Sequence, residues 1–462
     1  MSSLLRQFIR YVLPNTAGML GLSCYILADT FFVARGLGAD GLAALNLALP
    51  VYNLLNGAGL MAAMGGGARY AILRAQNDTQ AARRCFTRTL RLAAALVLPF
   101  FLAGLFFIEP LCTLLGARGQ IHSMACSYLR LILLFSPLFV LNTVLSAFAR
   151  NDGAPSRAMA AMLTGSAANI VMDYIFIFPM QLGIAGAVAA TCAAPLLGIL
   201  ILSGHIFSCR CGFSPAKAAF KPTAATAIAS AGLSAFVNEA AGGLVMLAFN
   251  TVILRIAGSG GVAAYGVVAN LAQVVTAMLT GIAQGVQPLV SHAFGSGALQ
   301  DLRRLCRWGE YTAVALAAAV CAAVLPLAGQ IAALFVGRQD ELLLLAACRG
   351  LRLYFPGFLF TGYSILTSAC LSAVGQGRAA FAVSICRGAL LSLPALLIGA
   401  ALGQMTGVWL SMPIVEFLTW IFAFFSAKRQ ICGRIAIDLR LLTRSDFNNG
   451  NSGLHPHTPQ RA

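Results

Sequence analysis

Long apolar stretches alternate with short polar loops along almost the whole chain. Each stretch is at least about 20 residues long, which an α-helix needs to cross the hydrocarbon core of a bilayer. We predict twelve such spans, at 11–34, 43–68, 92–115, 124–148, 158–180, 184–207, 225–256, 261–290, 309–336, 346–373, 380–401 and 406–427. Because backbone groups in lipid must be satisfied within the protein, the pattern predicts an all-α polytopic membrane protein.

Composition supports this class. Hydrophobic residues make up 59% of the 462 positions and charged residues 10%, against about 25% charged residues in a soluble domain. The segment before the first span is polar, and that span has no small-residue cleavage site behind it. We therefore expect no cleaved signal peptide.

The net charge of +17 would suggest a nucleic-acid partner in a soluble protein. Here most Lys and Arg residues fall on alternate loops, on the side of the amino terminus, as Arg83–Arg84 and Arg303–Arg304 do. The positive-inside rule then predicts that both termini are cytoplasmic. The charge therefore indicates membrane topology and no nucleic-acid binding.

The two halves of the chain resemble each other at a shift of 220 residues. The matching residues are Arg35 and Arg255, Gly38 and Gly258, Gly41 and Gly261, Ala43–Ala44 and Ala263–Ala264, Gly65 and Gly285, and the pairs Arg83–Arg84 and Arg303–Arg304. This many matches at one offset indicate an internal repeat. Six spans per half is an even number, so the halves enter the membrane from the same side and are related by pseudo-two-fold symmetry along the membrane normal.

The repeat predicts four regions. Residues 1–208 form an amino-terminal six-helix lobe, and 225–428 form a carboxy-terminal one. Residues 209–224 form a cytoplasmic linker between them, and 429–462 a cytoplasmic tail that is disordered at its end.

Asp29 is an acidic residue inside the first span, with Tyr25 one turn earlier on the same helix face. A charged residue at the centre of a span costs about 2.5–3.5 kcal/mol, and such residues usually serve an ion, a proton or a polar substrate. Asp173 lies in the fifth span with Asn169 one turn earlier, and Thr191 lies in the sixth. Together these oxygen atoms could hold Na⁺, or the two carboxylates could share a proton. Two alternatives without a transport role stay open. The Asp29 side chain could reach the membrane–water interface, or the acids could serve only as hydrogen-bonding groups in helix association.

The second half keeps the scaffold and changes the chemistry. Phe249 occupies the position that matches Asp29. Polar residues that could form a second site or line a cleft are Glu239, Asn270, Gln273, Gln284 and Gln287. Arg387 and Glu416 could form a structural pair or a functional one, and the sequence leaves this open.

Thirteen cysteines are scattered, and only Cys209 and Cys211 are close in sequence. We interpret them as small apolar residues in helix packing, and we assign no role to the five histidines. We expect no cofactor, and no metal beyond possible Na⁺ at Asp29 and Asp173.

In these features the chain resembles the multidrug and toxic compound extrusion (MATE) transporters. The resemblance runs from Tyr11 to about Lys428. The chain is similar in particular to the bacterial branch with a cation site in the amino-terminal lobe. It is carried by the twelve spans in two parallel repeats, by the first span with Pro14, Tyr25 and Asp29, and by the segments NIVMDYIFIF, LGIAGAVAAT, GVAAYGVVAN and GIAQGVQPLVS.

The resemblance implies a V-shaped pair of six-helix lobes that export organic, often cationic and amphiphilic compounds in exchange for Na⁺ or H⁺. It places the cation site on Tyr25, Asp29, Asn169, Asp173 and Thr191, which match in residue type and spacing. Pro14 matches a proline where helix bending has been proposed. Another branch has an acid in the seventh span, and Glu239 stands a few residues from that position.

We therefore expect a multidrug efflux antiporter in the plasma membrane of a prokaryote, which acts as a monomer with the bilayer and small organic substrates as its partners. One alternative is a flippase for lipid-linked precursors, or an exporter of one metabolite, on the same scaffold. Another is a membrane-embedded enzyme. We expect no enzyme, because the mid-span acids lie near no histidine that could complete a catalytic pair.

Overall fold

The structure is a computed structural model, and it describes residues 3–208, 211–219, 221–336 and 341–429. Every regular element in these residues is a helix. Most of the predicted tail lies outside the described residues, as do Cys209, Arg210 and Arg338.

The helices of the first half are α1 (Ser3–Ala75), α2 (Thr79–Phe106), α3 (Ile108–Leu114), α4 (Gly119–Leu134), α5 (Ser136–Asn151), α6 (Pro155–Ile177) and α7 (Gly183–Ile206). Those of the second half are α8 (Pro222–Gly295), α9 (Leu299–Val336), α10 (Glu341–Tyr354), η1 (Phe355–Gly357), α11 (Phe358–Ala373), α12 (Gly377–Ile385), η2 (Cys386–Leu390) and α13 (Ser392–Ala427). Helix α8 begins inside the segment expected as the linker.

The described helices confirm twelve spans. Ten helical segments, with the bent pair α4 and α5 taken as one, are long and apolar enough to cross a bilayer. Two of them, Pro222–Gly295 and Gly377–Ala427, contain a backbone break at Gly258 and Gln404 respectively and cross twice. The expected third span, 92–115, is interrupted at Phe107, where α2 ends and α3 begins.

The repeat is visible in the backbone. Helix α1 breaks at Gly38, with φ 69° and ψ −158°, and helix α8 breaks at Gly258, with φ 66° and ψ −161°. A positive φ of this kind is open to glycine and strained for other residues. The two glycines are 220 residues apart and give each half the same turn between its first two spans.

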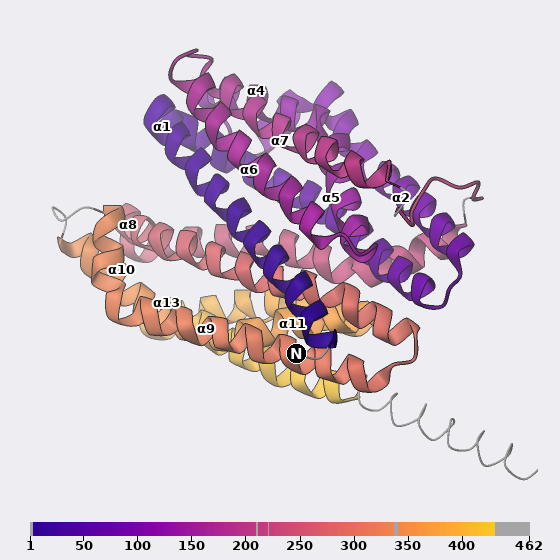
Figure 1. The fold of residues 1–462 in the computed structure, drawn as a ribbon. Coiled ribbons are helices and arrows are strands. Elements are labelled where there is room, and N and C mark those ends of the chain that lie inside the picture. The colour runs from indigo at the N-terminus through magenta and orange to yellow at the C-terminus, as the bar shows by residue number, and fades with distance from the viewer. Residues whose placement is uncertain (1–2, 209–210, 220, 337–340, 430–462) are drawn as a thin grey trace, which may run out of the picture.

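The helices of the two halves form two lobes (Figure 1). Buried apolar residues form two large clusters, one per lobe. One cluster runs from Ala44 to Phe213, and the other from Phe249 to Trp409. The second cluster also includes Phe8 and Val12, from the start of α1. The first helix of the chain therefore packs at its beginning against the core of the opposite lobe.

The lobes meet through small residues in a reciprocal way. A Cβ on Gly285 would lie 2.7 Å from Cα of Val12, and one on Gly65 would lie 2.0 Å from the carbonyl oxygen of Ile228. Glycine is needed at both positions because two backbones approach closely there. Each half thus packs the start of its first helix against the second span of the other half, as the pseudo-two-fold relation requires.

Candidate functional site

The structure brings Asp29 and Asp173 together inside the amino-terminal lobe. Asp29 lies in the first span, on α1, and is 7% exposed; Asp173 lies near the end of α6 and is 0% exposed. Their side chains interact directly. Two neighbouring carboxyl groups in an apolar lobe are costly unless a proton or a cation lies between them.

Asn169 and Thr191 complete the inner part of this group. With its amide oriented so that both groups find a partner, Asn169 donates from its nitrogen to Asp173 Oδ2 at 3.1 Å and accepts from the Thr191 backbone N–H at 3.2 Å. The Thr191 hydroxyl donates to the carbonyl oxygen of Ala187 at 3.1 Å, so its oxygen lone pairs remain open to a ligand. The amide therefore fixes one carboxylate oxygen of Asp173 and links α6 to α7.

Tyr25 stands at the edge of the group. Its hydroxyl lies near that of Tyr52, and it lies close enough to Asp29 to interact electrostatically. Of the five residues expected at this site, four converge at the acids, and Tyr25 connects them to a neighbouring cavity.

The oxygen atoms of this group fit a small hard cation or a proton. Asp29 Oδ1 and Asp173 Oδ1 are buried and have no hydrogen-bond partner among the described residues. Buried polar atoms are nearly always satisfied in proteins. Carboxylate, amide and hydroxyl oxygens are the ligands that hard cations take. The arrangement can therefore accept either a shared proton or an ion such as Na⁺.

A cavity of about 170 Å³ adjoins the acids, since Tyr25 and Thr191 are part of its wall. Helices α1, α5, α6, α7 and α8 contribute to the lining, so both lobes take part. Its other polar residues are Tyr52, Asn56, Asn142, Thr143, Ser146, Ser166, Arg150, Glu239 and Gln284. A mixed polar and apolar cavity beside a titratable pair is typical of a binding site.

Arg150 in the cavity wall is a residue that the sequence reading missed. It stands just after the predicted span 124–148, where an arginine is normally solvated, yet it is 4% exposed. Asn142, Ser146 and Arg150 follow one another at intervals of four on α5, so they share one helix face. That polar stripe in an apolar span was the signal that could have identified the cavity from the sequence.

Only some of the residues expected to form a second site or to line a cleft lie in the wall of this cavity. Glu239 and Gln284 line the cavity, and Glu239 lies near Asn56 of the opposite half. Gln287 is buried and donates to the carbonyl oxygen of Met64 at 3.2 Å, which joins the lobes. Asn270 is half-buried and Gln273 exposed, and neither belongs to the wall of this cavity.

Arg387 and Glu416 form a close ion pair in the carboxy-terminal lobe. Arg387 Nε donates to Glu416 Oε1 at 2.8 Å, and the Glu416 side chain is fully buried. This geometry favours the structural interpretation of the pair over a functional one.

Pro14 lies inside α1, where helical backbone continues on both sides of it. Proline removes one hydrogen bond from the helix ladder, to the carbonyl oxygen of Arg10. The expectation that α1 bends there stays a prediction.

The MatE family model matches residues 14–175 and 234–398. The multidrug export protein MepA of Staphylococcus aureus (strain NCTC 8325 / PS 47) is 27% identical over 422 residues, which are 90% of this chain and 92% of that protein. MepA of Staphylococcus saprophyticus is 26% identical over 421 residues, 90% of this chain and 91% of that protein.

Solved structures agree in fold. A multidrug resistance MATE family transporter of the MOP superfamily, in its outward-facing conformation, has a TM-score of 0.87 at 24% identity and covers 94% of this chain and 97% of its own. A MOP superfamily transporter from Pyrococcus furiosus, described as having a binding pocket of reverse polarity, has a TM-score of 0.85 at 24% identity, with 93% and 96% covered.

Proposed function

Because the chain belongs to the MatE family, we propose that it is a cation-coupled antiporter that exports organic, often cationic and amphiphilic compounds. The observation that carries the proposal is the interacting pair Asp29 and Asp173, which adjoins a cavity through Tyr25 and Thr191. The MepA proteins, which are similar over nine-tenths of the chain, are multidrug export proteins.

Antiport requires one site to exist in a loaded and an empty form. The pair Asp29 and Asp173 meets this condition, because a proton or Na⁺ would neutralise part of its charge and satisfy the buried oxygens. A ligand shifts a conformational equilibrium only by its differential affinity for the two states. The cation therefore binds the outward-open state more tightly, and its arrival from outside favours release of the substrate.

The coupling ion is Na⁺ or H⁺. Carboxylate, amide and hydroxyl oxygens serve both ions, so the residues alone do not separate them. No organic cofactor and no catalytic step enters the proposed cycle.

The cavity suits an amphiphilic substrate. Glu239 supplies an acidic group to attract an organic cation, and Tyr25 and Tyr52 supply aromatic faces. Since the cavity wall comes from both halves, rocking of the lobes would open it to one side of the membrane at a time.

One observation favours a second function. Arg150 lines the same cavity, and a buried guanidinium is suited to a carboxylate or a phosphate. A substrate with an anionic group, such as a lipid-linked precursor or a single acidic metabolite, would use it. Retention of ethidium export in an Arg150→Lys variant, with loss of export of anionic compounds, would support this alternative.

The proposed setting is the plasma membrane of a prokaryote, with both termini in the cytoplasm and the monomer as the working unit. Basic residues on alternate loops, such as Arg83, Arg84, Arg303 and Arg304, support this topology.

The test is ethidium transport in proteoliposomes under a Na⁺ gradient and a pH gradient, imposed separately. Stimulation by one gradient alone identifies the coupling ion. Ethidium export that neither gradient stimulates would contradict the antiporter proposal.

A further inference from the structure

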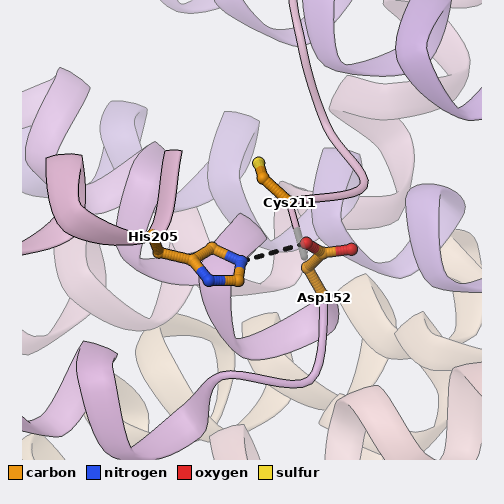
Figure 2. Close-up of side chains that lie close together, drawn as sticks. All are labelled: Asp152, His205 and Cys211. Atoms are coloured by element: carbon orange, nitrogen blue, oxygen red, sulfur yellow. Dashed lines mark hydrogen bonds and ion pairs between the residues drawn. The ribbon is translucent and has the colours of Figure 1, made fainter. Parts of the chain in front are cut away.

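We propose that Asp152, His205 and Cys211 bind a divalent transition-metal ion of the zinc class, which fastens the linker between the lobes to the amino-terminal lobe (Figure 2). The ligand atoms of these three side chains lie within 4.8 Å of one another. Among the described residues they form the one group of three or more such side chains with this spacing.

The three ligands come from separate segments that meet at one end of the lobe. Asp152 follows the last turn of α5, His205 lies in the last turn of α7, and Cys211 belongs to the linker. Figure 2 shows the His205 ring directed at the Asp152 carboxylate, with Cys211 beside it. The Asp152 side chain is fully buried and that of His205 is 6% exposed, whereas Cys211 is half-buried, so the cluster lies at the edge of the interior.

The donor set and its spacing fit the ion. Zinc takes imidazole nitrogen, thiolate sulfur and carboxylate oxygen, with bonds of about 2.0–2.3 Å in a tetrahedral arrangement. Such bonds set a nitrogen and an oxygen ligand about 3.3 Å apart. His205 Nε2 and Asp152 Oδ2 are 3.0 Å apart, so the ion would enter after a small separation of these two atoms. Water can provide a fourth ligand, as it does in open zinc sites.

Neighbouring groups hold the Asp152 carboxylate in place for this role. The Tyr70 hydroxyl donates to Oδ1 at 2.6 Å, and the Gly212 N–H donates to Oδ2 at 2.7 Å. Partners of this kind orient a ligand in metal sites and are part of their affinity. A Cβ on Gly212 would lie 2.4 Å from Asp152 Oδ1, so only glycine lets the linker approach this closely.

Arg74 is the positive group nearest the cluster, at 3.7 Å from Asp152 Oδ1. Its side chain is 38% exposed, so solvent screens its charge and it can turn away. It also faces Oδ1, whereas the ligand oxygen is Oδ2. Arg74 therefore does not close the site to a cation.

The cluster lies where the linker packs against the amino-terminal lobe, so a bound ion would act on the position of the linker. Phe213, next to this group, is buried among the rings of Tyr70, Phe86, Phe148 and His205. Farther along the linker, Ala216 N–H donates to Thr87 Oγ1 at 2.9 Å. An ion at Cys211 would fix the start of the linker at the point where it leaves the lobe, and would leave the Asp29–Asp173 pair untouched.

The test uses the full-length protein in detergent, treated with a chelator and titrated with Co²⁺ and Zn²⁺. We expect one equivalent of Co²⁺ to give the near-ultraviolet charge-transfer absorption of a cobalt–thiolate bond, and Zn²⁺ to displace it. Cys211→Ser should abolish this absorption, and Tyr70→Phe should weaken Zn²⁺ binding about 10- to 100-fold, as loss of a ligand's orienting partner does. The tail residues His455 and His457 supply no thiolate.

Cys126→Ser is the matched control, because Cys126 Sγ also lies near a histidine, 3.8 Å from His122 Nδ1. It should leave the cobalt spectrum unchanged. A second measurement needs no variant: Zn²⁺ should slow maleimide labelling of Cys211. Absence of the cobalt–thiolate absorption, its survival in Cys211→Ser, or Cys211 labelling that Zn²⁺ does not slow would each overturn the proposal.

Discussion

The two lobes have similar backbone folds, but at one matched position they carry side chains of different chemistry. Asp29 of the amino-terminal lobe interacts with Asp173, whereas Phe249, 220 residues later, is 2% exposed and stacks on Tyr265 with ring centroids 5.2 Å apart. The breaks at Gly38 and Gly258 have nearly the same dihedral angles. The carboxy-terminal lobe therefore folds with an aromatic ring where the amino-terminal lobe has a carboxylate. Folding does not require a carboxylate at this position, so Asp29 has another role.

The charges of the two lobes differ in the same way. Glu416 meets an opposite charge, Arg387, at 2.8 Å, whereas Asp29 and Asp173 meet each other. An opposite pair stabilises the fold that contains it, and a like pair must be stabilised by a bound proton or cation. The comparison predicts that the Arg387–Glu416 pair serves stability and that the Asp29–Asp173 pair serves transport.

The largest effect is expected for Glu416→Gln. This change leaves the Arg387 guanidinium, whose side chain is 15% exposed, without an opposite charge. Breaking a buried pair from one side costs about 3–5 kcal/mol, so the thermal midpoint of unfolding in detergent should fall sharply. The double variant Arg387→Met/Glu416→Met should recover most of the lost stability, because it leaves no lone charge. A stable single variant would show that the pair is not structural.

Asp29→Asn and Asp173→Asn should change the free energy of unfolding less than Glu416→Gln does, and they should reduce transport more. Each should reduce gradient-stimulated ethidium export about 5- to 150-fold, the range that coupling free energies of about 1–3 kcal/mol give. Neither should lower the thermal midpoint, since one of two adjacent acids is removed. Asp40→Asn, at an exposed aspartate after the same span, is the matched control and should transport normally. Full export in both site variants would refute the assignment.

A smaller loss of stability than that of Glu416→Gln is expected for alanine substitutions at the two backbone breaks, and it should be equal in the two lobes. Gly38→Ala and Gly258→Ala each force a side chain into a positive φ where no atom obstructs the new Cβ, which costs about 1–3 kcal/mol. Gly260→Ala, also in open space but without a positive φ, is the control. Equal losses for the first two variants and none for the third would confirm that the scaffold is symmetric; unequal losses would limit the repeat to sequence.

Much of the fold was predictable because apolar length and repetition are strong signals. The matching glycines at 38 and 258 even marked the backbone breaks. Helix ends were not predictable, because α1 and α8 continue past the apolar spans into polar residues such as Arg69 and Arg74. The interruption at Phe107 was missed, although Glu109 and Pro110 shortly after it are a signal, since proline removes a hydrogen bond from a continuing helix.

The candidate site was predictable where polar residues stand inside apolar spans, as Asp29, Asn169 and Asp173 do. Arg150 was missed because it stands at the end of a span, where arginine is normally solvated; only the interval of four from Ser146 indicated its face. The cluster of Asp152, His205 and Cys211 was not predictable, since its members are brought together by packing of the linker against the lobe.

The most direct test of this account is cation movement driven by substrate. Proteoliposomes are given an ethidium gradient alone, and the flow of H⁺ or Na⁺ in the opposite direction is recorded for the wild-type protein, Asp29→Asn and Asp40→Asn. We expect counterflow of one cation in the wild-type protein and in Asp40→Asn, and none in Asp29→Asn. Counterflow that persists in Asp29→Asn would contradict the claim that the carboxylates of the amino-terminal lobe couple transport to the cation.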